Sequence, residues 1–289
     1  MSLYPSYARP ASLAQASELL GALSSGTVII AGGQEIMPHI NHGALMPDVY
    51  VDIGGLKELR GISAADGWLS IGALTVHREL QTDPLVREHA PILAYAATLA
   101  GGGRQVHNRA TLGGNIVAQH PLYDIVPSLL ALGAEVEIAR GGETRRVALA
   151  AMLKDTSHGL GSEAILVRVY VPAMPAGTGW AYEKLKSSGG AYGSANAAAL
   201  VRLEGGKVAS GQLIIGAVAD RPIDAGSALQ GLVGQALTPG LAAQLEARCT
   251  ALVKEPLSDA QGAGDWRQAM AGVIARRAFT AAIAKAGQD

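Results

Sequence analysis

Cysteine is nearly absent from this 289-residue sequence, in which Cys249 is the one thiol. A single cysteine excludes an internal disulfide, a four-cysteine zinc site and an iron–sulfur cluster held by this chain alone. The scarcity of cysteine also fits a reducing compartment. We therefore expect a cytoplasmic protein without disulfides.

An excess of charge of one sign is missing too, because 23 Lys and Arg residues nearly balance 24 Asp and Glu residues. Without a basic field, binding to nucleic acid or to an anionic membrane surface is not expected. No apolar run reaches the ~18 residues that cross a bilayer, and residues 1–10 lack the apolar core of a signal peptide. The expected protein is soluble and has no membrane span.

Common catalytic motifs are absent as well. The sequence has no Gly-x-Ser-x-Gly, so serine hydrolysis has no support, and no Gly-x-Gly-x-x-Gly of the Rossmann type. His39 and His42 have a spacing that helical zinc ligands use, but no third ligand is well placed and Pro38 is expected to disrupt a helix. We expect no metal site.

Glycine, by contrast, is abundant, with 37 residues in a chain that is 49% hydrophobic. Two Gly-Gly turns stand out. One, at residues 31–35, follows a short β-branched run that reads as a buried strand, and the other is at residues 111–115. Successive backbone N–H groups at such turns form a nest for an anion, and Thr111 and Asn115 add side-chain hydrogen bonds. Two such loops suit a dinucleotide pyrophosphate; the alternative is that both are ordinary loop glycines.

The pattern of apolar residues and breakers predicts an α+β protein in two domains. In residues 1–175, helices are predicted at 12–23, 84–99 and 125–132, and strands at 28–31, 49–53, 68–73, 134–138 and 164–171. A proline-containing linker follows. The C-terminal domain, residues 176–289, is predicted to have a strand at 180–185, a hairpin of 195–203 with 207–218, and helices at 239–253 and from 265.

The glycine loops and their flanking segments resemble the FAD-binding medium subunit of the molybdenum hydroxylases, the family of xanthine dehydrogenase and aerobic carbon monoxide dehydrogenase. The matches run in order over nearly the whole chain. They are Ala31-Gly32-Gly33, residues 71–75, Thr111-Leu112-Gly113-Gly114-Asn115, residues 120–132, Tyr182-Glu183-Lys184-Leu185, residues 216–222, Trp266-Arg267 and residues 275–278. Together these matches are specific, although no single one is.

The resemblance implies a fold of the vanillyl-alcohol-oxidase type. Its FAD-binding domain would have two subdomains, about 1–55 and 56–175, with FAD between them and the C-terminal α+β domain of antiparallel sheet plus helices. The implied cofactor-binding residues are Ala31, Gly32, Gly33, Gln34, Glu35, Thr75, Ala110, Thr111, Gly113, Gly114, Asn115, His120, Asp124 and Lys184.

Some positions depart from the family pattern. The family often has Arg, Gly and Asp where this chain has His107, Ala110 and His120. We expect His77, His107 and His120 to line or flank the flavin pocket. The Ser-Gly-rich stretch after Lys186 contains Tyr192, which is our candidate for an aromatic residue over the isoalloxazine. No residue is assigned as a catalytic acid or base.

The implied function is electron transfer in a heterotrimeric molybdenum hydroxylase. Substrate would be oxidised on a large molybdopterin subunit, electrons would pass through [2Fe–2S] clusters of a small subunit to this FAD, and the flavin would reduce an external acceptor. The complex would be a dimer of heterotrimers. Two alternatives stay open, a self-contained flavin oxidase and a dinucleotide-binding assembly module without redox turnover.

Overall fold

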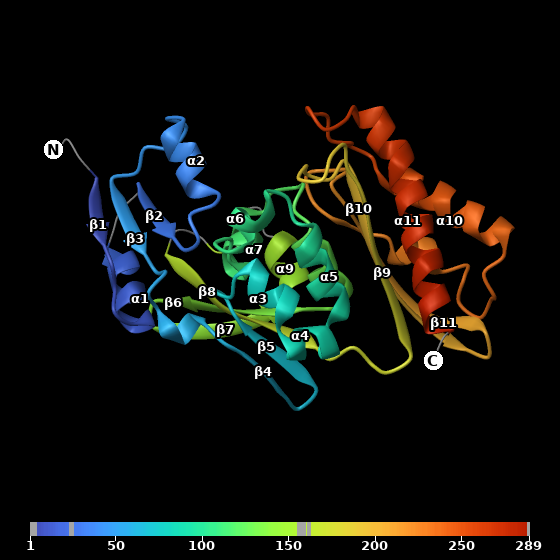
Figure 1. Cartoon of the computed structure of the whole chain (residues 1–289), viewed down its shortest axis with the longest axis horizontal. Helices are drawn as coiled ribbons and strands as arrows, with labels where there is room; N and C mark the ends of the chain where they lie inside the picture. Colours follow the sequence, from blue (N-terminus) through green and yellow to red (C-terminus); the bar gives the residue numbers. More distant parts are fainter. Residues whose placement is uncertain (1–4, 23–25, 155–159, 161–162, 288–289) are drawn as a thin grey trace.

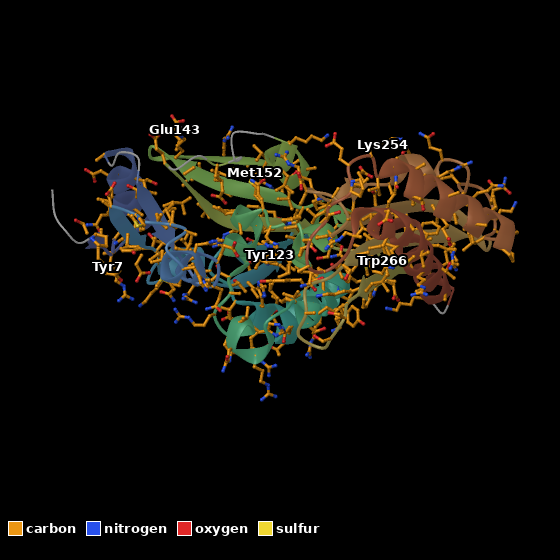
Figure 2. All side chains as sticks on the ribbon, turned by 90° about the horizontal axis from the view of Figure 1, so that it is seen from above. Tyr7, Tyr123, Glu143, Met152, Lys254 and Trp266 are labelled. Carbon is orange, nitrogen blue, oxygen red and sulfur yellow. The ribbon has the colours of Figure 1, made fainter. Side chains whose placement is uncertain are left out.

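The computed structural model describes residues 5–22, 26–154, 160 and 163–287. Three sheets lie side by side along the long axis of the molecule, in the order of the chain (Figure 1). Figure 2 shows Tyr123 near the middle of this row, between Tyr7 at the N-terminal end and Trp266 in the C-terminal part. The α+β class predicted from the sequence is confirmed.

The first sheet is parallel and small. Its strands, in the order β1-β3-β2, are β1 (Ser6–Ala8), β3 (Val49–Asp52) and β2 (Thr27–Ile30). Helix α1 (Leu13–Ala22) is capped at its N-terminus by Ser12, whose hydroxyl accepts a hydrogen bond from Gln15 N at 3.2 Å. Ala16 and Leu20 of α1 are buried in a cluster that includes residues of the second sheet, which fixes the first sheet against the second.

The second sheet is antiparallel, in the order β4-β5-β8-β6-β7. Its strands are β4 (Ile62–Ala65), β5 (Trp68–Gly72), β8 (Ala164–Pro172), β6 (Glu135–Arg140) and β7 (Glu143–Ala148), preceded by the 3-10 turn η1 (Lys57–Leu59). Short helices lie along it (Figure 1): α3 (His77–Thr82), α4 (Pro84–His89), α5 (Pro91–Leu99), α6 (Gly103–His107), α7 (Leu112–Ala118), α8 (Ile125–Ala131) and α9 (Leu149–Lys154).

Two expectations about proline were wrong. The single helix predicted over 84–99 is broken into α4 and α5, because Pro91 has no N–H to donate and Ala90 leaves the helical region with φ −143° and ψ 56°. Conversely, Pro38 lies within a short helix, α2 (Ile36–Asn41). It is tolerated there because it occupies the first turn, where a backbone N–H has no intrahelical acceptor.

The third sheet forms the C-terminal α+β part, in the order β12-β11-β10-β9. Its strands are β9 (Thr178–Leu185), β10 (Ala195–Glu204), β11 (Lys207–Gly216) and β12 (Ile223–Asp224), followed by η2 (Gly226–Leu229), α10 (Pro239–Leu252) and α11 (Gly264–Ala286). The predicted hairpin is confirmed as β10 and β11. Helix α11 lies very close to β9, since a Cβ atom on Gly179 would be 1.9 Å from the carbonyl oxygen of Ala282.

Arg267 on α11 connects two of the segments that carry the family resemblance. Its fully buried guanidinium donates to the carbonyl of Ala217, a residue with a left-handed φ of +62°, and to that of Gly262 at 3.3 Å, and pairs with Asp259. The segment after β11 is therefore fixed to the start of α11 by one side chain.

Arg267→Ala is expected to lower the free energy of unfolding by about 3 kcal/mol, because it leaves buried carbonyls without a donor and opens a cavity. Urea unfolding of the variant measures this loss. Arg277→Ala is the matched control, since Arg277 is exposed on the same helix and its removal should change stability by no more than ~0.5 kcal/mol. Equal stability of both variants would refute the structural role of Arg267.

Among the residues described, no helix combines the length and apolar character that crossing a bilayer requires.

Candidate functional site

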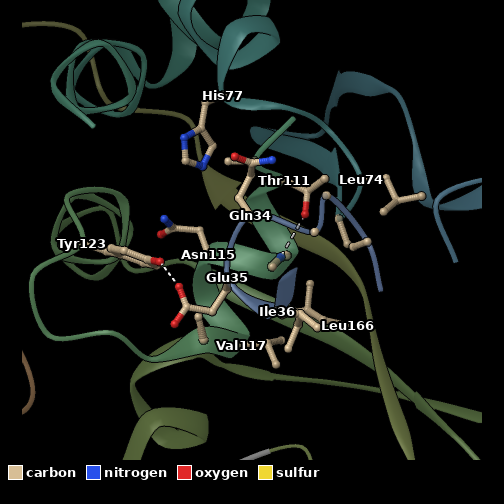
Figure 3. A pocket seen from close by; sticks show the side chains of 18 of the residues that line it. Gln34, Glu35, Ile36, Leu74, His77, Thr111, Asn115, Val117, Tyr123 and Leu166 are labelled. Carbon is tan, nitrogen blue, oxygen red and sulfur yellow. Dashed lines mark hydrogen bonds between the residues drawn. The ribbon is translucent and has the colours of Figure 1, made fainter. Parts of the chain in front are cut away.

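A cavity of about 310 Å³ lies where the first two sheets meet the C-terminal part. Its walls come from the turn between β2 and α2, from the segments around α3, α6 and α7, from β8, and from Tyr192 (Figure 3). The floor from β8 is apolar and consists of Ala164, Ile165 and Leu166. The wall of the cavity is therefore partly apolar and partly polar, and several segments of the chain contribute to it.

The first glycine loop, residues 31–35, presents free backbone donors to this cavity. Gly33 has φ +75°, which glycine adopts without strain, and its carbonyl accepts from Met37 N at 3.1 Å. Within the described residues, the N–H groups of Gly32, Gly33 and Gln34 have no hydrogen-bond acceptor. Unpaired amides at the edge of a cavity form the kind of nest that binds an anion.

The second glycine loop, residues 111–115, differs from the expectation. The N–H groups of residues 112–115 are already used: Leu112 N donates to Thr75 O, Gly113 N to Ala73 O, Gly114 N to Thr111 Oγ1 and Asn115 N to Thr111 O, at 2.8, 2.8, 3.2 and 2.9 Å. The expected second nest of free amides was therefore wrong. These amides hold the start of α7 on the end of β5, and the loop offers the side chain of Asn115 to the cavity instead.

The first glycine loop is in direct contact with Arg109 and Ala110, the two residues just before the second glycine loop. A Cβ atom on Gly32 would be 2.1 Å from the carbonyl oxygen of Arg109 and 3.3 Å from the Cα atom of Ala110. Real Cβ atoms do not approach that closely, so only glycine allows this arrangement at position 32. The Ala110 carbonyl also accepts from His77 N at 3.0 Å, which ties α3 to the same point.

Several polar atoms around the cavity are buried without a partner. They are Thr75 Oγ1, Asn115 Oδ1 and both ring nitrogens of His77. A buried polar group that stays unpaired costs about 1–3 kcal/mol, so native proteins satisfy nearly all of them. Burial, and secondarily His107, lowers the pKa of His77 to about 4, which makes its ring neutral at pH 7. These groups are suited to a polar ligand.

A buried ion pair closes the C-terminal side of the cavity. The Lys184 ammonium lies 2.7 Å from a carboxylate oxygen of Asp124 and donates to Leu99 O at 2.8 Å. Tyr182 and Asn196 donate to the other oxygen of Asp124, at 3.3 and 3.4 Å. Burial raises the pKa of the Asp124 carboxyl, against the opposing effects of Lys184, Tyr182 and Asn196. This cluster joins α8 to β9 and β10.

Aromatic rings lie at the mouth of the cavity. The Tyr123 hydroxyl donates to Glu35 of the first glycine loop, and the rings of Tyr123 and Tyr192 stack on His120 with centroids 4.6 and 5.4 Å away. Burial and the neighbouring Glu35 raise the pKa of Tyr123. His39 also contacts Glu35, at 3.1 Å. The predicted shielding residue, Tyr192, is thus on the cavity wall with 41% of its surface exposed.

The structure brings together most of the residues predicted from sequence. On the cavity wall are Ala31, Gly32, Gly33, Gln34, Glu35, Ala110, Thr111, Gly113, Gly114, Asn115, Asp124 and Tyr192. Thr75, His120 and Lys184 are not on the wall: the Thr75 hydroxyl is buried without a partner, His120 stacks on Tyr123, and Lys184 pairs with Asp124. His107 does not line the cavity, because its ring bonds Gln81 and Ala100 O. No group of potential metal ligands occurs within the described residues.

Sequence reasoning missed part of the wall. Tyr123 lies inside a matched motif but was not assigned to the site, and its contact with Glu35 joins residues far apart in sequence. Val117 and the β8 residues Ile165 and Leu166 carry no polar signal at all. Only the fold shows that they face the cavity.

Comparison with known proteins gives matches over both parts of the chain. Residues 3–174 match the family "FAD binding domain in molybdopterin dehydrogenase", and residues 180–282 match "CO dehydrogenase flavoprotein C-terminal domain". The carbon monoxide dehydrogenase medium chain of Hydrogenophaga pseudoflava is 34% identical over 96% of this chain and 97% of its own. The glyceraldehyde dehydrogenase medium chain of Sulfolobus acidocaldarius is 28% identical over 96% of this chain and 99% of its own.

Solved structures agree with these matches. Carbon monoxide dehydrogenase from Hydrogenophaga pseudoflava superposes with a TM-score of 0.93 at 33% identity, covering 99% of both chains. Quinoline 2-oxidoreductase from Pseudomonas putida 86 superposes with a TM-score of 0.91 at 31% identity, also covering 99% of both. The similarity thus extends over the full length of the chain.

Proposed function

The chain belongs to the family of FAD-binding medium subunits of molybdopterin-dependent dehydrogenases, and on that premise we propose that it relays electrons through FAD to an external acceptor. It is an oxidoreductase subunit, and the redox chemistry is supplied by the flavin when bound. The residues of this chain bind, orient and shield that flavin. The organic substrate is selected on another subunit.

One observation carries the proposal: free amides of the first glycine loop face the same cavity as buried polar groups without partners. The pyrophosphate of FAD offers oxygen acceptors for the amides of Gly32, Gly33 and Gln34. The cavity volume of about 310 Å³ is within the usual range of ~300–1,000 Å³ for ligand pockets. The donors and the cavity therefore fit this cofactor.

The proposed cofactor-binding set keeps all positions assigned from the sequence, in two roles. Wall residues contact FAD, and Thr75, His120 and Lys184 position those wall residues. We also propose residues 1–175 as the FAD-binding domain and 176–289 as the C-terminal domain. The interface between them contains the Asp124–Lys184 pair, so the cavity is completed only when both are in place.

The proposed partners are a large molybdopterin subunit and a small subunit with [2Fe–2S] clusters, arranged as a dimer of heterotrimers. This chain is poorly equipped to hold clusters, because its one cysteine is buried and burial raises the pKa of the Cys249 thiol to about 12. The division of labour in relatives named medium chains supports the same arrangement.

Purification of the full chain, alone and with its partners, tests the proposal. We expect a yellow protein that releases FAD on denaturation, and a complex whose flavin absorbance bleaches when the substrate of the complex is added. A chain that turns over an organic substrate alone would instead be a self-contained oxidase. A chain with FAD that never bleaches in the complex would be an assembly module.

Tyr192→Ala is expected to change the reactivity of the flavin without releasing it. Tyr192 lies on the cavity wall with 41% of its surface exposed, and its side chain stacks on His120 instead of on a glycine loop, so its loss exposes the cofactor to solvent. We expect the rate of flavin reoxidation to change about fivefold, on the order of 1 kcal/mol in the barrier. Tyr95→Ala is the control, because Tyr95 is exposed and lies outside the cavity. The FAD-to-protein ratio should be the same in both variants. Loss of FAD from Tyr192→Ala alone would contradict this role.

A further inference from the structure

His77 is a buried histidine without a hydrogen-bond partner inside the described part of the chain. It is the first residue of α3, only 2% of its surface is exposed, and it lines the cavity. Neither ring nitrogen has a partner. An imidazole buried in this way loses its bonds to water without replacement, so the fold carries a cost that a ligand can offset.

The neighbouring histidine cannot satisfy His77. The ring of His107 is 6.2 Å away between centroids, and both of its nitrogens are occupied. Its Nε2 is 2.8 Å from Ala100 O, to which it donates, and its Nδ1 accepts from Gln81 Nε2 at 2.9 Å. Both ring nitrogens of His107 are therefore already used, and His107 is not among the residues that line the cavity. The free nitrogens of His77 are left to whatever occupies the cavity.

The backbone holds His77 in a fixed position relative to both glycine loops. Its N–H bonds Ala110 O, and Val76 and Thr111 form a β-bridge at the same point. Figure 3 shows the ring on the same side of the cavity as the side chains of Gln34 and Asn115. The imidazole therefore faces the space next to the free amides of the first loop, where an anion bound by those amides would lie.

We propose that His77 hydrogen-bonds a phosphate oxygen of the FAD pyrophosphate and takes up a proton when the cofactor binds. This inference rests on the proposed FAD site. Neutral in the empty cavity, the ring gains a partner and a nearby negative charge on binding. Histidine is the side chain whose charge responds to such a change near neutral pH.

The protonation follows from the electrostatics of the cavity. Without ligand, burial is the largest influence and His107 the second, and together they lower the pKa of His77 to about 4. An adjacent dianion favours the charged ring and raises this pKa. At a pH between the pKa of His77 in the free protein and its higher pKa in the FAD complex, the protein takes up a proton when FAD binds. By linkage, the affinity for FAD then increases as the pH falls.

Other ionisable groups surround α3 but are engaged or act weakly on the ring. His107 is the group whose charge affects His77. Glu35 is bound to Tyr123, and Asp124 to Lys184. The remaining ionisable groups on α3, on the elements packed against it and just before the second glycine loop are Arg78, Glu79, Arg87, Glu88, His89, Tyr95, Arg104 and Arg109.

Titration calorimetry of FAD into the flavin-free full chain tests the proposal. Measurements in buffers with different heats of ionisation give the number of protons taken up. Wild type is compared with His77→Gln, which keeps hydrogen bonds but cannot become charged, and with His77→Phe, which keeps the ring shape only. His42→Gln is the control, because His42 is exposed and bonds Pro38 O.

We expect wild type and His42→Gln to take up a proton and to bind FAD more tightly at pH 5.5 than at pH 8, by about tenfold. His77→Gln should lose the proton uptake and the pH dependence. His77→Phe should bind FAD about tenfold or more weakly, the loss expected for one charged hydrogen bond.

Proton uptake in His77→Gln equal to that of wild type would overturn the inference, as would wild-type affinity in His77→Phe. The thermal stability of flavin-free His77→Phe should equal or exceed that of wild type, because the replaced ring had no partner. If that variant fails to fold, the proton count of His77→Gln alone decides. Failure of wild type to bind FAD at all would refute the proposed function instead.

Discussion

Replacing Gly32 by valine is expected to abolish FAD retention. A Cβ atom at this position would stand 2.1 Å from the carbonyl oxygen of Arg109, a backbone atom that cannot swing aside. The first glycine loop must then move away by an ångström or more, which displaces the free amides of Gly32, Gly33 and Gln34 together. Each of these amides is expected to donate a hydrogen bond to the charged pyrophosphate of FAD. Losing two of these bonds should weaken FAD binding by more than ~100-fold.

Flavin released from the purified variant and circular dichroism of the protein measure the effect. Gly21→Ala is the matched control, because Gly21 lies on α1 and an added Cβ meets nothing within 4 Å. We expect full flavin content in the control and less than ~10% in Gly32→Val. A folded Gly32→Val protein with full flavin content would show that the contact between Gly32 and Arg109 is unnecessary.

Gly114→Val is also expected to lower FAD retention, but for a different reason. Its Cβ would be 2.8 Å from Thr111 Oγ1, the side chain that caps α7, so the cap is displaced and bulk enters the cavity wall. The side chain of Thr111 can rotate, whereas the Arg109 carbonyl cannot. We therefore expect Gly114→Val to retain more flavin than Gly32→Val in the same assay.

The sequence was sufficient to locate the glycine loops, because each follows from local chemistry. A short β-branched strand, β2, followed by Gly-Gly is a local signal that is weak by itself, and Thr111 followed by Gly-Gly-Asn is another; together they located both loops. The role of each loop could not be predicted from the sequence. Whether an amide is free depends on partners such as Ala73 O and Thr75 O, and these come from a segment that only the fold brings alongside.

The elements missed or misjudged have equally specific reasons. Strand β7 is polar and exposed, with no apolar alternation to mark it, and it exists because it pairs with β6 after the Gly141-Gly142 turn. The break at Pro91 was visible as a proline, but the apolar residues on both sides favoured one helix. The segment that forms β8 was predicted as a strand, but its place on the cavity wall depends on three-dimensional contacts that the sequence does not show.

Lys184→Met is expected to destabilise the protein by about 3–5 kcal/mol at pH 7, the range for removing one partner of a buried ion pair. The side chains of Lys184 and Asp124 are 2% and 1% exposed, so the remaining carboxylate would be buried without a cation. Methionine fills a similar volume, which keeps the cavity term small. Urea unfolding as a function of pH measures the loss.

The pH dependence of the stability loss in Lys184→Met identifies its cause. Burial already raises the pKa of Asp124, and loss of the Lys184 charge raises it further. An acid whose pKa is higher in the folded than in the unfolded state favours folding at low pH and loses that contribution as the pH rises through its folded pKa. The deficit of Lys184→Met should therefore be smallest near pH 5 and grow toward pH 8.

Two comparisons separate this cause from a general packing defect. Lys186→Met removes an exposed lysine close by, which bonds only Gly189 O, and should change stability by no more than ~0.5 kcal/mol at every pH. Adding Asp124→Asn to Lys184→Met removes the unpaired charge and should restore most of the lost stability. If the loss of stability is independent of pH and the double variant shows no recovery, the unpaired charge of Asp124 is not the cause of that loss.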